Sequence, residues 1–324
     1  MTGRGVDVDE YHSVVLSSRF LPQQLIPSAI GCRKMSDPYL TFCIDNYLPT
    51  EVDAELSATF PDGLIMSSDG ERFAEYLSLS DGSSSAKTFL QHNPIWADYV
   101  AAWCSEQNLR HCLTVFRSEF SKRYTPMWRW ILKRRLQKLS NLQVTVTLAT
   151  YTKGFHLSPH SDDKYKVFSA IHYLPSLDST PDARGGTTFY FPRSGTTRGD
   201  LRQFSEWSRG VRKFLPIWIS PVIEASLSRR YTEAEAVNES EFANFGSYFE
   251  QCFHHDYKKN RICGFVKNDW SMHEVDLSEY PVGEVRRSVL INIRVKEQAV
   301  SKIVPRIEKW LSACKQALKE KQKS

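Results

Sequence analysis

Hydrophobic and polar positions alternate with a period of two in several stretches between residues 141 and 296. An alternating pattern rich in β-branched side chains is typical of half-buried strands. The clearest stretches are LQVTVTLATY, KYKVFSAIHYLP (which ends at Pro175), TTFYFP and EVRRSVLINIRV. NRICGFVKN and SMHEVDL predict two more strands in the same part of the chain.

The pattern before residue 140 is mostly helical. A strand is predicted over Tyr39 to Ile44, and residues 63–85 are rich in turn-forming residues, so we expect loops there. Apolar residues at helical spacing predict helices that begin near Thr50, Pro94, Leu109 and Pro126. Within the later region, residues 193–259 break the strand pattern and look helical or irregular.

Strands gathered in one region, with helices segregated from them, predict a mainly β fold: an antiparallel sandwich or jelly roll with a helical buttress. We expect a single domain over residues 1–324. Its parts are an N-terminal arm and helical support (1–140), the β core (141–192 and 260–296), a mixed insertion that is a candidate lid (193–259) and a C-terminal helix (297–324).

Composition narrows the class of protein. The chain is 41% hydrophobic and 24% charged, as globular proteins are. Its longest apolar runs, such as FLPIWISPVI, are short and contain proline, and its N-terminus has no basic start followed by an apolar core, so neither a membrane span nor a secretory signal is predicted. Seven cysteines without a C-x-x-C pair indicate reduced thiols in the cytoplasm. The net charge of +5 permits an anionic ligand, and no nucleic-acid motif is present.

Candidate chemistry is concentrated in YTKGFHLSPHSD, residues 151–162. His160 and Asp162 are two positions apart, so on an extended backbone they point to the same face. A second histidine from a distant strand would complete a 2-His-1-carboxylate triad, which leaves open positions on Fe(II). By itself an H-x-D pair is more often part of a surface turn than of a metal site.

Two residues of the last predicted strand suit a bound carboxylate. Arg286 and Ser288 share one face of that strand, where a guanidinium can form a two-pronged, charge-assisted pair and a hydroxyl can add one hydrogen bond. Arg287 is the rival candidate. Its face carries the apolar residues of the strand, which favours packing against helices, so Arg286 is preferred.

The order of these motifs resembles the Fe(II)/2-oxoglutarate-dependent dioxygenase superfamily, in particular the branch of prolyl 4-hydroxylases and bacterial small-molecule hydroxylases. The motifs are Y-x-x-G, H-x-D, a strand ending in YLP, GG-T, a histidine and R-x-S. The resemblance spans about Tyr39 to Val295 and is dense only in residues 151–192 and 262–295. It implies a double-stranded β-helix, the cupin-like form of the jelly roll.

The resemblance also implies the roles of particular residues. His160, Asp162 and His273 would be the iron ligands, and Arg286 with Ser288 would hold the distal carboxylate of 2-oxoglutarate. Tyr151 would line the cosubstrate site, although it could equally be a packing aromatic at the end of a strand. The cofactors implied are Fe(II), 2-oxoglutarate and O2, with ascorbate as a supporting reductant.

The implied reaction is oxidation of an unactivated C–H bond. Related halogenases replace the carboxylate by a small residue, so Asp162 favours hydroxylation, desaturation or ring closure. The preferred hypothesis is that the substrate is a small molecule of specialised metabolism. The alternatives are hydroxylation of a protein, peptidyl or carrier-tethered side chain, and a non-catalytic jelly-roll binding protein.

The chain departs from the family in one respect. His273 lies 111 positions after Asp162, farther than is usual, and the surplus is residues 193–259, a candidate lid, dimer surface or docking element. The remaining histidines are weaker metal candidates. We expect His254 and His255 at the surface or in the lid, His156 in an exposed loop, and His172 in the core or beside the ligands.

Overall fold

The computed structural model describes Phe20, Leu25 and residues 39–61, 74–122, 139–162, 166–175, 182–196, 245–267 and 270–296. Four predictions fall wholly or largely outside these residues. They concern the N-terminal arm, the helix from Pro126, most of the insertion 193–259 and the C-terminal helix 297–324.

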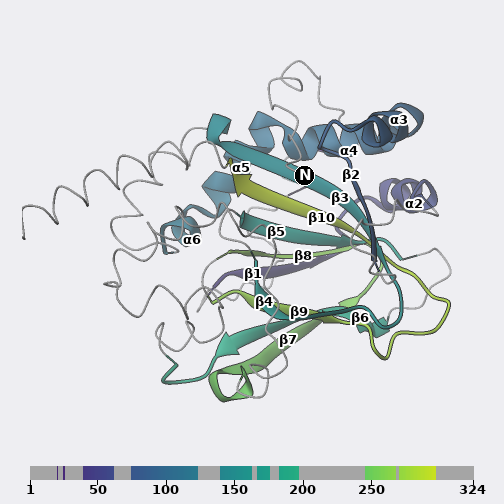
Figure 1. Ribbon diagram of the computed structural model, residues 1–324. Coiled ribbons are helices and arrows are strands. Elements are labelled where there is room, and N and C mark those ends of the chain that lie inside the picture. Colours follow the sequence, from purple (N-terminus) through teal and green to yellow (C-terminus); the bar gives the residue numbers. More distant parts are fainter. Residues whose placement is uncertain are drawn as a thin grey trace, which may run out of the picture.

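The described strands form two antiparallel sheets that face each other (Figure 1). The six-stranded sheet has the order β1–β8–β5–β10–β3–β2, and the four-stranded sheet has the order β4–β9–β6–β7. The strands are β1 (Thr41–Asp45), β2 (Ala74–Ser78), β3 (Leu142–Tyr151), β4 (His156–Ser161), β5 (Lys166–Tyr173), β6 (Asp182–Pro192), β7 (Phe249–Tyr257), β8 (Arg261–Val266), β9 (Met272–Asp276) and β10 (Arg286–Val295).

From β3 to β10 the chain passes repeatedly between the two sheets. β3, β5, β8 and β10 belong to the larger sheet, and β4, β6, β7 and β9 to the smaller one. Only β6 and β7 follow each other within one sheet, as a paired hairpin with the insertion between them. This connectivity is that of a jelly roll, so the predicted mainly β fold with helical support is confirmed.

The helices cover the outer face of the six-stranded sheet (Figure 1). The period-two pattern decides which side chains they meet: Val289, Ile291 and Ile293 of β10 belong to the core shared with helix α4, whereas Ser288 and Leu290 point the other way. The helices are α2 (Thr50–Ala58), α3 (Ser84–His92), α4 (Pro94–Cys104), α5 (Glu106–Val115) and α6 (Arg117–Lys122), and a 3-10 turn, η2 (Leu139–Asn141), precedes β3.

Three strands lie where other structure was expected. β2 occupies part of the predicted loop region, where it pairs with β3 at the edge of the sheet. β4 begins at His156, inside the expected H-x-D loop, because β9 supplies a partner strand and a bulge absorbs the irregular Ser158–Pro159 segment. β7 lies within the range predicted to be helical or irregular, so the β core extends back to Phe249.

β7 was missed because its pattern is not a clean alternation. Three consecutive residues, Glu250 to Cys252, are exposed, and a register shift interrupts its pairing with β6. Where the structure describes the chain, no helix is long and apolar enough to cross a membrane.

Candidate metal centre

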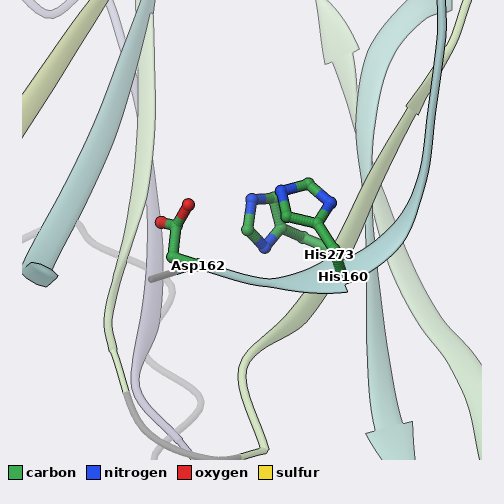
Figure 2. Close-up of side chains that lie close together, drawn as sticks. All are labelled: His160, Asp162 and His273. Carbon is green, nitrogen blue, oxygen red and sulfur yellow. The ribbon is translucent and has the colours of Figure 1, made fainter. Parts of the chain in front are cut away.

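His160 and His273 lie directly opposite each other on the paired strands β4 and β9. Their ring centroids are 4.3 Å apart, and both side chains are buried. Asp162, one residue beyond the end of β4, turns its carboxylate toward the two rings (Figure 2). One ligand atom from each residue lies within 4.8 Å of the others, so the three side chains could hold a metal ion.

Asp162 is held by side chains from the opposite sheet. Ser169 of β5 donates a hydrogen bond to Oδ2 at 2.6 Å, and the Lys166 ammonium lies 2.7 Å from Oδ1. Ser169 Oγ also lies 2.9 Å from Asn292 Oδ1 on β10. The carboxylate of Asp162, which follows β4 of the smaller sheet, is therefore fixed in position by side chains of the larger sheet.

The electrostatic environment keeps the three groups in the protonation states that a metal requires. Burial, together with the nearby His160, lowers the pKa of His273 to about 3. Burial also lowers the pKa of His160. Burial raises the pKa of Asp162, but its neighbours, with the Lys166 ammonium first among them, together outweigh this effect, and the pKa lies well below its usual range. At neutral pH the site therefore presents two neutral imidazoles and one carboxylate.

A second cluster of candidate ligands lies on the outer face of the smaller sheet. It consists of His156, Glu274 and Asp276, of which only Glu274 is buried. His156 Nε2 lies 3.0 Å from Glu274 Oε1, and the Tyr190 hydroxyl donates to Oε2 of the same carboxylate. Glu274 thus already has two partners, and the inner cluster is the stronger metal candidate.

Arg286 lies between the sheets with only 1% of its surface exposed. Its Nε donates to the Gly185 carbonyl at 2.6 Å, and Nη1 lies 3.5 Å from Ser288 Oγ. Within the described part of the chain, Nη2 is buried and has no hydrogen-bond partner. A buried guanidinium nitrogen without a partner is costly, and a carboxylate would satisfy it.

Three tyrosine rings surround the Arg286 guanidinium. Its carbon lies 5.1 Å from the ring centroids of Tyr151 and Tyr173 and 5.7 Å from that of Tyr257. Arg287, in contrast, points to the helical side, where its guanidinium lies 5.5 Å from the Phe60 ring. The structure therefore places Arg286, Ser288 and Tyr151 together on the inner face and Arg287 away from it.

The inner face of β5 connects the two regions. Ser169 contacts Asp162, and Tyr173 contacts the Arg286 guanidinium. Ser169 and Tyr173 are four residues apart on the strand, so their positions along it are about 13 Å apart. Between these levels lie Ile171 and its cross-strand partner Leu290, which face the smaller sheet yet are only half-buried. Solvent therefore reaches the inner face between the metal candidate and the arginine.

Comparison with known proteins gives structural likeness only. No protein-family model and no curated protein sequence matches the chain. A prolyl-4-hydroxylase from Pseudomonas putida is 13% identical with a TM-score of 0.37, and the match covers 80% of this chain and 94% of that chain. HygX from Streptomyces hygroscopicus, with nickel and 2-oxoglutarate bound, is 10% identical with a TM-score of 0.35, and the match covers 79% of this chain and 82% of that chain.

A third solved structure, the Fe(II)/(alpha)ketoglutarate-dependent dioxygenase TqaL, is 10% identical with a TM-score of 0.41, and the match covers 79% of this chain and 83% of that chain. These values assign no activity to this chain, so its function has to be inferred from its own side chains.

The other four candidate histidines lie outside the His160–Asp162–His273 cluster. His172 is fully buried on the helical side of β5, where Nε2 lies 3.5 Å from Asp53 Oδ1. This matches the expected core position. His156 is exposed, as expected, but it belongs to strand β4 and contacts Glu274, so the expected loop is wrong for this residue. His254 and His255 lie half-buried on β7, at the edge of the smaller sheet.

The sequence did not identify the residues that support the site. Ser169, Lys166 and Gly185 reach their partners across the gap between the sheets, which no local pattern reveals. Asn292 was recognisable in part, because it shares the inward face of β10 with Arg286.

Proposed function

We propose that this protein is an Fe(II)- and 2-oxoglutarate-dependent oxygenase that oxidises an unactivated C–H bond of a small molecule. One observation carries the proposal: a buried His160–Asp162–His273 cluster and a buried Arg286 with an unpartnered nitrogen face the same space between the sheets. The donor set is the one that non-haem Fe(II) oxygenases use.

In this proposal His160, Asp162 and His273 hold the iron, and the remaining coordination positions stay open to the cosubstrate and O2. Bound iron supplies the redox chemistry that couples oxidative decarboxylation of 2-oxoglutarate, with release of succinate and CO2, to oxidation of the substrate. The residues of the chain bind and orient the reactants. Ser169 and Lys166 hold Asp162 in place, as supporting hydrogen bonds commonly do for metal ligands.

Arg286 would bind the distal carboxylate of 2-oxoglutarate. Nη2 is available for it, and Ser288 and the three tyrosine rings fix the orientation of the guanidinium. We further propose that ascorbate supports turnover and that the protein acts in the cytoplasm.

The test combines metal binding with succinate release. We expect the purified chain to bind Mn(II), measured by electron paramagnetic resonance, and to release succinate from 2-oxoglutarate with Fe(II), O2 and ascorbate. Asp162→Ala should lose both properties. The matched control is Asp276→Ala, a substitution of the same kind on the outer cluster, which should keep both. Equal activity in wild type and Asp162→Ala would refute the proposed site.

A further inference from the structure

Two cysteines lie directly opposite each other at one edge of the larger sheet. Cys43 of β1 is the cross-strand partner of Cys263 of β8, and β1 is the outermost strand of the sheet at that side. Both side chains pack into the same cluster on the inner face, together with Tyr173, and both are thiols. They are 220 positions apart in the sequence (263 − 43), so strand pairing brings them together.

The hydrogen bonds of the β1–β8 pair indicate how close the two thiols can come. The Val266 amide donates to the carbonyl of Leu40, the residue opposite it, at 3.0 Å. Hydrogen-bonded and non-hydrogen-bonded pairs alternate along an antiparallel ladder, so Cys43 and Cys263, three positions farther on, are a non-hydrogen-bonded pair. The Cα atoms of such pairs are about 4.5 Å apart. A disulfide bridges Cα atoms about 4.4–6.8 Å apart, so it can form here without separating the strands.

The two thiols differ in their surroundings. Cys263 is fully buried, and burial raises its pKa to about 11, so it is protonated at neutral pH. Cys43 is half-buried and interacts electrostatically with the Arg261 guanidinium. The carboxylate of the nearby Asp45 is shared between Arg261 and Lys258. Reactive thiols are typically partly exposed and close to a cation, so Cys43 is the one that meets an oxidant first.

We propose that Cys43 and Cys263 are a redox-active pair that forms a disulfide when the protein encounters a peroxide. Cys43 Sγ attacks one oxygen of hydrogen peroxide, the O–O bond breaks, water leaves and Cys43 becomes a sulfenic acid. The Cys263 sulfur then attacks Cys43 Sγ, and its proton leaves with the sulfenic hydroxyl as a second water. Two thiols thus lose two electrons and two protons, and one peroxide becomes two waters. A thiol reductant restores the pair by exchange.

The disulfide would change a contact that leads to Arg286. In the reduced protein the Cys263 thiol donates a hydrogen bond to the Tyr173 hydroxyl at 3.4 Å, and the Tyr173 ring lies 5.1 Å from the Arg286 guanidinium. A disulfide sulfur has no proton to donate. Tyr173 keeps its hydrogen bond with Thr187 at 2.7 Å. Oxidation therefore weakens carboxylate binding at Arg286 without abolishing it, a consequence that rests on the proposed function.

The first test maps the disulfide directly. The full chain is reduced, freed of reductant and metal, and treated with a small excess of hydrogen peroxide, after which remaining thiols are alkylated and peptides are analysed by mass spectrometry. We expect a linked Cys43–Cys263 peptide that disappears after treatment with dithiothreitol. Oxidation of the exposed Cys252 shows that the peroxide has acted. If Cys252 is oxidised while Cys43 and Cys263 both remain thiols, the proposal is overturned.

Substitutions test the order of the two steps. In Cys263→Ser, Cys43 should stop at the sulfenic acid, which dimedone traps as a stable adduct. In Cys43→Ser, Cys263 should remain a thiol and take up no dimedone. The control Cys252→Ser should form the disulfide as wild type does. Dimedone on Cys263 instead of Cys43 would overturn the proposed sequence of steps, and circular dichroism of each variant detects a folding defect.

The second test measures the consequence for the cosubstrate. Peroxide is removed, Mn(II) is added, and equilibrium dialysis measures the affinity for labelled 2-oxoglutarate. Oxidation should weaken it about two- to threefold, the low end of the range for one hydrogen bond, because a thiol is a weak donor. Dithiothreitol should reverse the effect, and Cys43→Ser should show none.

The two proposals fail separately. If the disulfide forms and the affinity is unchanged, the link to Arg286 is overturned and the disulfide site stands. If the reduced chain binds no 2-oxoglutarate, the proposed function is overturned, and the peptide map alone decides the disulfide.

Discussion

The Arg286 guanidinium lies 5.1 Å from the centroid of the Tyr151 ring, directly across the β10–β3 pair. Tyr173 is at the same distance on the other side. The two tyrosine rings and the hydrogen bond to the Gly185 carbonyl thus restrict the guanidinium to one orientation. In this orientation Nη2 has no hydrogen-bond partner among the described residues. Pre-ordering of this kind reduces the entropy that a bound carboxylate must remove.

Replacing Arg286 should therefore impair cosubstrate binding. We expect Arg286→Gln to weaken the affinity for 2-oxoglutarate by about 1.5–3 kcal/mol, which is the range for hydrogen bonds to charged groups. Equilibrium dialysis of labelled 2-oxoglutarate with the Mn(II)-loaded chain measures this change. Arg287→Gln is the matched control, because Arg287 points toward Phe60, and its affinity should be unchanged. The opposite ranking of the two variants would make Arg287 the anchor.

Ser169 should influence the metal through Asp162. Ser169→Ala removes the hydrogen bond to Oδ2, and loss of a supporting partner of this kind typically costs about 10–100-fold in metal affinity. Titration of Mn(II) detects the change. Ser80→Ala is the control: its hydroxyl accepts a hydrogen bond from the Val146 amide, away from the site, so it should lower stability without altering metal affinity. An unchanged affinity in Ser169→Ala would show that Lys166 alone is sufficient to position Asp162.

Gly264 is required by the close approach of neighbouring groups. A Cβ there would lie 2.5 Å from the Ser169 carbonyl oxygen and 2.6 Å from the Phe42 ring. Gly264→Ala should lower the free energy of unfolding by about 1–3 kcal/mol, as overpacking usually does. Urea denaturation measures the change. At Gly246 an added Cβ meets nothing within 4 Å, so Gly246→Ala should be close to neutral. Equal stability of both variants would argue against the close contact at Gly264.

Asp45 should contribute to the pH dependence of stability. Its hydrogen bond with Arg261 lowers its pKa from 3.8 to about 2, and Lys258 acts in the same direction. Because the folded pKa is the lower one, this stabilisation is present above pH 3.8 and is lost as the pH falls toward 2.

The expected size is small, about 1 kcal/mol or less, because the pair is partly exposed to solvent. Asp45→Asn should remove it and flatten this part of the stability curve. Denaturation between pH 5 and pH 2 tests the prediction against Asp98→Asn, a substitution on helix α4. A curve of Asp45→Asn that parallels wild type throughout would contradict it.

The predictable parts of this protein are those with a local signal. The alternation of apolar and polar residues in β3 and β10 predicted both strands. It also predicted that Arg286 points inward, because every second residue of β10 packs against the helices. The spacing of His160 and Asp162 likewise indicated a shared direction. What could not be predicted depends on partners far along the chain: β4 requires β9, and β7 requires β6.

The supporting contacts of the site fall into the same class. Lys166 is only four residues from Asp162, but the two meet because the chain passes from one sheet to the other between them.

Asp162 thus connects the two sheets of the jelly roll. It directly follows β4 of the smaller sheet and is held by side chains of the larger sheet. The binding of a metal ion at Asp162 would therefore depend on the distance between the two sheets. Its spectroscopic signal would disappear as soon as the sheets separate, even where each sheet keeps its own ladder of hydrogen bonds. Unfolding followed at the ion and unfolding followed by backbone circular dichroism would then be two distinguishable events.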